Sequence, residues 1–468
     1  MPRQVVVIGA GLSGLASAAL IAKAGSPVIL LEANSWIGGK SRRIELGGQI
    51  IDTGPSLLTF PEVLGQILET YDNLGTKTKT DMPELLALAE VGKYFYKDLE
   101  VTLPILEGQP FAEDWKKFES SHSDLSAAIL KLLTSSPNDL STLPALGKLL
   151  KVYGVNLNAQ SYINSLSWMD KDLKEIIAIH TLNAGVAPKD TLALFATITA
   201  IMAHEGIRVP KGGMNMIAQL LARIAKAAGV EIRLNEPVTK IAQGMVTTTL
   251  GRYRADIIVS SLDDAMTNSL IRERPSKIAK RRSCSGVAIY AVLSKPLPEG
   301  TVTHSVVMPD DANELHKSLT SFRQPNQTMA FVNYYKPNDI YQNQKPTVGI
   351  LLTAASDGKS YNLESDWVRK ELDRISKLIG LEQPIDEYFE EYKILDPEYF
   401  GSFGGGNGAL YGATRPLWQA GPFNIPAAHN PLRSWLYRVG ASTHPGGGMP
   451  AVLGGALVTS KKIISRLR

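Results

Sequence analysis

The chain has 468 residues, of which 44% are hydrophobic and 20% charged, a composition typical of a globular protein with two or three domains. The formal net charge of +4 is too small to indicate a nucleic-acid-binding protein. The single cysteine, Cys284, excludes an intramolecular disulfide and indicates a reducing compartment such as the cytoplasm.

The first secondary-structure elements carry a dinucleotide-binding motif. An apolar run over residues 4–8 predicts a buried strand, a glycine loop over 9–14 follows it, and an Ala-rich helix is expected over 15–24. In such a loop the first glycine allows a tight turn, the second lets a pyrophosphate approach the backbone, and the third lets helix and strand pack closely. The helix N-terminus adds unpaired N–H groups for the phosphates. A second strand over 28–31 leads to an acidic residue at the spacing expected for a ribose ligand. The residues predicted to bind the dinucleotide here are Gly9, Ala10, Gly11, Ser13, Gly14 and Glu32.

A second glycine-rich segment distinguishes FAD from NAD. The sequence Gly38-Gly-Lys-Ser41 follows the acidic residue, and Asp52-Thr-Gly-Pro55 comes soon after. This segment resembles the second glycine motif of the FAD-dependent amine oxidase and carotenoid desaturase superfamily. In that superfamily the backbone and the basic side chain run beside the pyrophosphate and the ribityl chain. The resemblance implies FAD as the cofactor, with Gly39, Lys40, Ser41, Gly54 and Pro55 beside it.

The central part of the chain resembles the same superfamily. Residues 209–217 introduce a helix that is expected to reach Ala228, and a strand is expected over 255–260. The segment 229–241 between them is similar to one whose valine touches the adenine through its backbone. The resemblance therefore assigns Val238 to the cofactor site.

The C-terminal segment indicates one family within this superfamily. Gly440-Ala-Ser-Thr-His-Pro-Gly-Gly-Gly-Met-Pro450 resembles the signature of bacterial-type phytoene desaturases, in which this loop and the N-terminus of the next helix face the flavin ring. The resemblance implies that Gly440, Gly447 and Met449 contact FAD and that His444 lies near the flavin.

The expected fold class is α/β, with a Rossmann-like FAD-binding domain assembled from discontinuous segments and an α+β substrate domain in which helices cap a sheet. The FAD-binding domain is expected to comprise residues 1–72, 205–290 and 400–468. Residues 73–204 are predicted to form a helical region that associates with substrate and membrane. Residues 291–399 are predicted to supply the sheet of the substrate domain, with strands over 302–308 and 347–353 and a helix over 365–379.

Two amphipathic segments, 125–133 and 143–153, bear on the partners of the protein. Leucines recur at helical spacing with Lys131, Lys148 and Lys151 between them. The helices either bury one face in their own core or lie in a membrane interface as a monotopic patch. The resemblance favours the interface, because moving a forty-carbon polyene into water costs on the order of tens of kcal/mol. No apolar run reaches the roughly 18–20 residues of a membrane span, and the N-terminus leads straight into a strand. We therefore expect a cytoplasmic protein without a signal peptide, peripherally associated with the cytoplasmic membrane.

The resemblance implies an FAD-dependent desaturase of a long apolar polyene. A hydride would pass from carbon to flavin N5 and a proton would leave the neighbouring carbon. The candidate catalytic residues are His444, Asp170 and Lys171, although an exposed helix turn also explains the last two. No metal-ligand spacing occurs in the sequence. The absence of a second dinucleotide fingerprint favours oxygen or a membrane quinone as the electron acceptor over NADPH.

Other functions stay open at this point. A carotenoid isomerase that uses reduced flavin without net redox change fits the same motifs, and so does an enzyme similar to amine oxidases or protoporphyrinogen oxidase. A non-catalytic prenyl-binding protein on the same scaffold, like the Rab GDP-dissociation inhibitors, is disfavoured because both glycine motifs and Glu32 are intact.

Overall fold

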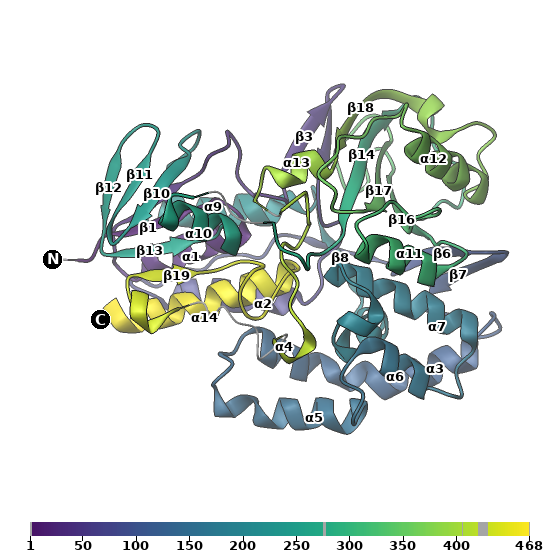
Figure 1. Ribbon diagram of the computed structural model, residues 1–468, viewed down its shortest axis with the longest axis horizontal. Helices are drawn as coiled ribbons and strands as arrows, with labels where there is room; N and C mark the ends of the chain where they lie inside the picture. Colours follow the sequence, from purple (N-terminus) through teal and green to yellow (C-terminus); the bar gives the residue numbers. More distant parts are fainter. Residues whose placement is uncertain (1, 275–277, 405, 420–428, 468) are drawn as a thin grey trace.

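The computed structural model describes residues 2–274, 278–404, 406–419 and 429–467. Two sheets dominate the fold, and helices surround both (Figure 1). The helices are α1 (Leu12–Lys23), α2 (Pro61–Asn73), α3 (Ala112–His122), α4 (Ser126–Leu133), α5 (Leu143–Tyr153), α6 (Ala159–Ser165), α7 (Lys171–Ala178), α8 (Ile198–Glu205), α9 (Asn215–Ala227), α10 (Asp264–Arg272), α11 (Ala312–Thr320), α12 (Asp366–Leu378), α13 (Pro397–Gly401) and α14 (Met449–Leu467).

The first sheet is parallel and has five strands in the order β19-β13-β1-β2-β9. The strands are β1 (Val5–Ile8), β2 (Val28–Leu31), β9 (Glu231–Arg233), β13 (Ile257–Ser260) and β19 (Leu436–Arg438). All four residues of β1 are buried because the sheet is covered on both faces, as is usual for parallel sheets. The helix α1 is buried along nearly its whole length and packs against both α9 and α14. Segments from the beginning, the middle and the end of the chain therefore share one core.

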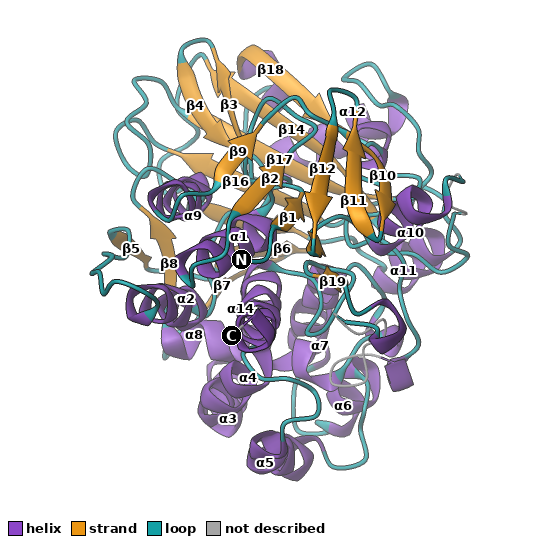
Figure 2. Cartoon of the chain, turned by 90° about the vertical axis from the view of Figure 1, so that its left-hand side faces the viewer, coloured by secondary structure: helices purple, strands orange, loops and turns teal. Residues whose placement is uncertain are grey.

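A three-stranded antiparallel sheet extends the central part of this unit (Figures 1 and 2). Its strands are β10 (Val238–Ala242), β11 (Gly244–Thr248) and β12 (Arg252–Ala255). Two short antiparallel pairs lie outside the large sheets. They are β3 (Arg43–Leu46) with β4 (Gln49–Asp52), and β5 (Leu85–Leu88) with β8 (Ile207–Pro210).

The second large sheet has seven strands in the order β18-β14-β17-β16-β15-β6-β7. The strands are β6 (Gly92–Tyr96), β7 (Leu99–Leu103), β14 (Ser285–Leu293), β15 (His304–Val307), β16 (Ala330–Tyr335), β17 (Thr347–Ala354) and β18 (Phe389–Leu395). One face packs on α12, where alternate residues such as Val332, Val348 and Ile350 meet Leu372 and Ile375. The opposite face, which we call the inner face, carries Tyr94, Tyr290, Val306, Phe331 and Leu351.

The region 73–204 contains the strand β5 and the hairpin β6–β7, which the expectation of a helical region does not include. The hairpin β6–β7 joins the seven-stranded sheet through parallel pairing of β6 with β15, although helical periodicity dominates this part of the sequence. The helices α3 to α8 of this region share a core with the inner face of the sheet, since Trp115, Phe118 and Ile176 belong to one buried cluster with Tyr94 and Val306. The tertiary pairing with β15 is a long-range contact, which periodicity within the segment does not reveal.

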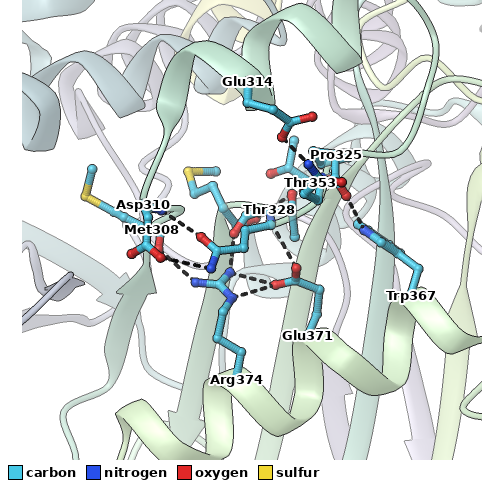
Figure 3. Close-up of polar contacts among 12 residues, drawn as sticks. Met308, Asp310, Glu314, Pro325, Thr328, Thr353, Trp367, Glu371 and Arg374 are labelled. Carbon is cyan, nitrogen blue, oxygen red and sulfur yellow. Dashed lines mark hydrogen bonds and ion pairs between the residues drawn. The ribbon is translucent and has the colours of Figure 1, made fainter.

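A buried polar network fastens α12 to the second sheet (Figure 3). The guanidinium of Arg374 forms an ion pair with Glu371 at 2.6 Å and donates to the backbone carbonyl groups of Met308 and Thr328. Glu371 in turn accepts a hydrogen bond from the backbone N–H of Thr328 at 3.1 Å. Burial raises the pKa of Glu371, and Arg374 opposes this effect. Since every charge in the network has its partners, we interpret it as structural.

We expect Glu371→Leu to destabilise the protein by about 3–5 kcal/mol, because it leaves the charge of Arg374 buried without its carboxylate. Removing Glu364 from its exposed pair with Arg369 of α12 should cost no more than about 1 kcal/mol. Urea unfolding of the two variants checks the comparison, and equal losses would contradict the role given to the buried pair.

Candidate cofactor site

The glycine loop lies where β1 ends and α1 begins. Gly9 has a φ of +95°, a conformation that favours glycine. A Cβ on Gly14 would lie 2.0 Å from the carbonyl oxygen of Gly9, so close helix–strand packing requires glycine there. A Cβ on Gly11 would meet only the hydroxyl of Ser261, at 3.6 Å, which is an ordinary contact. The protein's own packing therefore does not require glycine at position 11, whereas a pyrophosphate at the loop does.

Glu32 follows β2 and its carboxylate is buried beside the loop. One oxygen accepts the backbone N–H of Ala10 at 2.7 Å, and the other accepts the backbone and side-chain N–H groups of Asn34 at 2.9 and 2.7 Å. The backbone of Glu32 also exchanges hydrogen bonds with Arg233 and Glu236. The structure thus brings the segment that leads to Val238 beside Glu32. Sequence reasoning missed Asn34, because its role depends on a turn that no spacing rule specifies.

The second glycine motif lies directly against the first. The backbone N–H of Gly38 donates to the carbonyl of Ala10 at 2.8 Å, and a Cβ on Gly39 would lie 3.3 Å from the Cα of Gly11. Farther along, the backbone carbonyl of Ser41 accepts a hydrogen bond from the side chain of Asn215 at 2.9 Å. The hydroxyl of Ser41 is buried and has no hydrogen-bond partner among the described residues.

The segment Gly54–Pro55 connects this site to the second sheet. The backbone N–H of Gly54 donates to the hydroxyl of Tyr290 on the inner face at 3.1 Å. Pro55, which is partly buried, continues the chain away from this contact.

Lys40 and Asp263 are the charged groups that the fold brings together at the site. The ammonium group of Lys40 donates to the carbonyl oxygen of Leu410. Desolvation by the surrounding protein lowers the pKa of Lys40 and Asp263 opposes this effect, although solvent still reaches the lysine side chain.

Asp263 follows β13 and forms the N-cap of α10. Its carboxylate accepts hydrogen bonds from the backbone N–H of Ala265 at 2.9 Å and from the hydroxyl of Ser442 at 3.0 Å. Burial raises the pKa of Asp263, and Lys40 is one of the groups that lower it. Sequence reasoning missed Asp263, although its place directly after a buried parallel strand was an available signal.

The C-terminal loop approaches the same edge of the sheet. A Cβ on Gly440 would lie 3.4 Å from the hydroxyl of Ser13, which is 3.0 Å from the hydroxyl of Ser261. The residues that follow β1, β13 and β19 therefore meet here. Met449 is buried at the start of α14. Gly447 is exposed, and a Cβ on it would lie 2.7 Å from the ring of Tyr411, a residue that sequence reasoning also missed.

The candidate catalytic residues make contacts in two different places, His444 with the loop after α4, and Asp170 and Lys171 at the start of α7. His444 is buried, and its Nε2 is 3.1 Å from the carbonyl oxygen of Ser135, in the loop after α4. Asp170 and Lys171 are exposed at the start of α7, where the carboxylate of Asp170 accepts the backbone N–H of Asp172 at 2.8 Å. The backbone N–H of Asp170 donates to Asp114 of α3. These contacts all belong to the helical region, and a catalytic role for the three residues stays a prediction.

Neither a metal site nor a membrane-spanning helix is found among the described residues. No group of three His, Cys, Asp or Glu side chains in the described ranges is placed to hold a metal ion. None of the helices in this part of the chain combines the length and the apolar character that a membrane crossing needs.

A parallel sheet whose carboxyl edge holds a glycine loop, a buried acid and a second glycine motif is the architecture of a dinucleotide-binding oxidoreductase. The model of the flavin containing amine oxidoreductase family matches residues 12–457. The chain belongs to this family, and its cofactor is FAD, as predicted. The room for a Cβ at Gly11 and the unpartnered hydroxyl of Ser41 fit such a ligand.

Relatives and solved structures agree with this assignment. The chain is 25% identical to a phytoene desaturase of Fusarium fujikuroi, over 99% of this chain and 89% of the relative. It is also 25% identical to a 1-hydroxycarotenoid 3,4-desaturase of Flavobacterium sp., over 98% of this chain and 99% of the relative. A double mutant of putrescine oxidase superposes with a TM-score of 0.66 at 17% identity, covering 99% of this chain and 98% of that one. Cyclohexylamine oxidase of Brevibacterium oxydans gives a TM-score of 0.62 at 16% identity, covering 100% of both chains. These structures confirm the predicted α/β fold.

Proposed function

We propose that the protein is an FAD-dependent desaturase that removes two hydrogens from a CH–CH bond of a long apolar polyene of the carotenoid type. The observation that carries the proposal is the full-length similarity to phytoene and carotenoid desaturases. Bound FAD supplies a two-electron acceptor for a hydride from carbon. The chain's own residues bind the cofactor at the carboxyl edge of the parallel sheet. The apolar residues of the inner face, such as Phe331 and Leu351, are suited to hold a polyene and to exclude water.

An anaerobic assay tests this function. We expect phytoene-type polyenes in liposomes to bleach the flavin absorbance of the purified holoenzyme, whereas putrescine and cyclohexylamine should leave it unchanged. Bleaching by the amines instead would favour an amine oxidase. Conversion of one polyene isomer into another by pre-reduced enzyme, without net oxidation, would favour an isomerase. Reoxidation of the reduced enzyme by oxygen and by a quinone then identifies the acceptor, for which we propose one of these two.

We further propose that the protein works at a membrane surface through the segment 140–157. Five large apolar side chains in this segment are exposed, namely Leu140, Leu143, Leu150, Val155 and Leu157, at 58–94% of their area. The helix α5 buries only Ala145 and Tyr153 and lies at the edge of the molecule, away from both sheets (Figures 1 and 2). This exposure favours the membrane interface over burial of the helix in the protein's own core. Lys148 and Lys151 on the same helix suit anionic lipids.

We expect Leu143→Asp with Leu150→Asp to reduce co-sedimentation with anionic vesicles by at least about a hundredfold, because each buried leucine contributes about 1.5–3 kcal/mol. Neutralising Lys148 and Lys151 with glutamine should have a smaller effect, about fivefold for each charge removed. Leu250→Asp is the matched control, since Leu250 is 73% exposed in the turn between β11 and β12. Unchanged sedimentation of the leucine variants would contradict the proposed interface.

A further inference from the structure

The inner face of the seven-stranded sheet holds two polar side chains whose hydrogen-bonding atoms are unused. His304 is 3% exposed, and neither of its ring nitrogens has a hydrogen-bond partner among the described residues. The side-chain oxygen of Asn333 is also buried without a partner. Buried polar atoms are normally paired, because leaving one unpaired costs stability. Two such side chains at one place require an explanation.

The two residues are neighbours on the same face. His304 of β15 lies directly opposite Asn333 of β16 in the antiparallel register. Side chains opposite each other in such a pair have Cβ atoms about 4.5–5.5 Å apart. Strand alternation places His304 with Val306, and Asn333 with Phe331, on the face away from α12.

This part of the face adjoins the cofactor site. The backbone of Ser56, one residue after Pro55, lies close enough to His304 to favour its charged form, but no hydrogen bond of good geometry joins them. Burial is the larger effect and lowers the pKa of His304 to about 4, so the ring is neutral at neutral pH. On the other side, Asn333 pairs with Gly349 of β17, and the ring of Tyr290 lies over this glycine, 3.3 Å from the position of an added Cβ.

Two other buried histidines have a hydrogen-bond partner on each ring nitrogen. The ring of His180 bonds to the hydroxyl of Tyr94 at 2.6 Å and to the amide of Asn183 at 3.3 Å. His122 bonds to the carbonyl of Phe118 and to the hydroxyl of Tyr162. His304 differs from these two histidines, because both of its ring nitrogens, one donor and one acceptor, are unused among the described residues, whereas His316 and His429 each have one such nitrogen.

Building on the proposed function, we infer that His304 and Asn333 form a subsite for a hydroxyl group, so that the substrate is a polyene alcohol and not the parent hydrocarbon. An alcohol oxygen accepts a hydrogen bond from an imidazole N–H and its own proton goes to the side-chain oxygen of Asn333. A carbonyl group leaves the oxygen of Asn333 unpaired, and a hydrocarbon leaves both side chains unpaired. A site built to bond a hydroxyl strongly rejects the analogue that lacks it.

The test compares two polyenes of equal length, one a hydrocarbon and the other its terminal alcohol, with the holoenzyme in liposomes under anaerobic conditions. We expect kcat/KM for flavin reduction to favour the alcohol by at least about a hundredfold. The variants His304→Phe and Asn333→Leu should lose most of this preference and use the hydrocarbon at least as well as the wild type does. Phe331→Leu is the control on the same face, and it should change both substrates in the same proportion.

The outcomes separate the inference from the function on which it rests. If neither polyene reduces the flavin, the proposed desaturase function fails. If both reduce it equally, or the hydrocarbon is preferred, the function stands and the hydroxyl subsite is wrong. If the two variants do not fold, the preference of the wild-type enzyme between the two polyenes still decides the matter.

Discussion

Replacing Gly11 by valine should give a folded protein that purifies without flavin. Gly11 has φ −68° and ψ 172°, an extended conformation open to any L-residue. A Cβ there meets only the hydroxyl of Ser261, at 3.6 Å. The side chain would instead occupy the space into which the pyrophosphate must come. We expect no bound FAD by absorbance, together with a circular dichroism spectrum like that of the wild type.

A matched control is available in the same loop. Gly14→Ala should damage the fold itself, because its Cβ would lie 2.0 Å from the carbonyl oxygen of Gly9. The two variants therefore separate loss of ligand from loss of structure. If Gly11→Val retained full flavin occupancy, the phosphate loop would have to lie elsewhere.

The local motifs of the cofactor site could be predicted from the sequence because each of them depends only on residues that are close together in the chain. Each glycine of the first loop acts within a strand, a turn and a helix that are continuous in the chain. The acidic residue at position 32 is fixed by the length of one β–α–β unit. The expected helices over 125–133, 143–153 and 365–379 lie within about one residue of α4, α5 and α12 for the same reason, since apolar residues at helical spacing predict each of them.

The residues that were missed depend on contacts between distant segments. Asp263, Tyr411 and Ser442 meet at the site only after three separate parts of the chain have packed together. The pairing of β6 with β15 joins segments that are about 200 residues apart in the sequence. The orientation of His444 is another case, because its hydrogen bond to Ser135 depends on how α4 docks against α14. None of these contacts can be predicted from the periodicity of the local sequence.

The second large effect is expected in the C-terminal loop, at Gly447. The ring of Tyr411 lies between two glycines, since a Cβ on Gly447 would approach it to 2.7 Å and a Cβ on Gly185 to 2.8 Å. Tyr411 is also held by its backbone N–H, which donates to the hydroxyl of Ser283 at 3.0 Å. Its neighbour Leu410 supplies the carbonyl that accepts the ammonium group of Lys40. A side chain at position 447 must therefore displace Tyr411 and disturb the contact of Lys40.

We expect Gly447→Leu to keep the fold and part of its FAD but to lose at least about a hundredfold in flavin reduction by a polyene, because a misplacement of about 1 Å has an effect of this size. His444→Ala should cost less, since the hydrogen bond to Ser135 that it removes is worth about 0.5–1.5 kcal/mol and hydride loss from carbon needs no obligatory proton donor. Combining Gly447→Leu with Tyr411→Ala makes room for the leucine and should restore part of the rate if displacement of the ring is the cause. Anaerobic stopped-flow reduction measures all three variants. A near-normal rate in Gly447→Leu would mean that this loop and Tyr411 do not position the reacting groups.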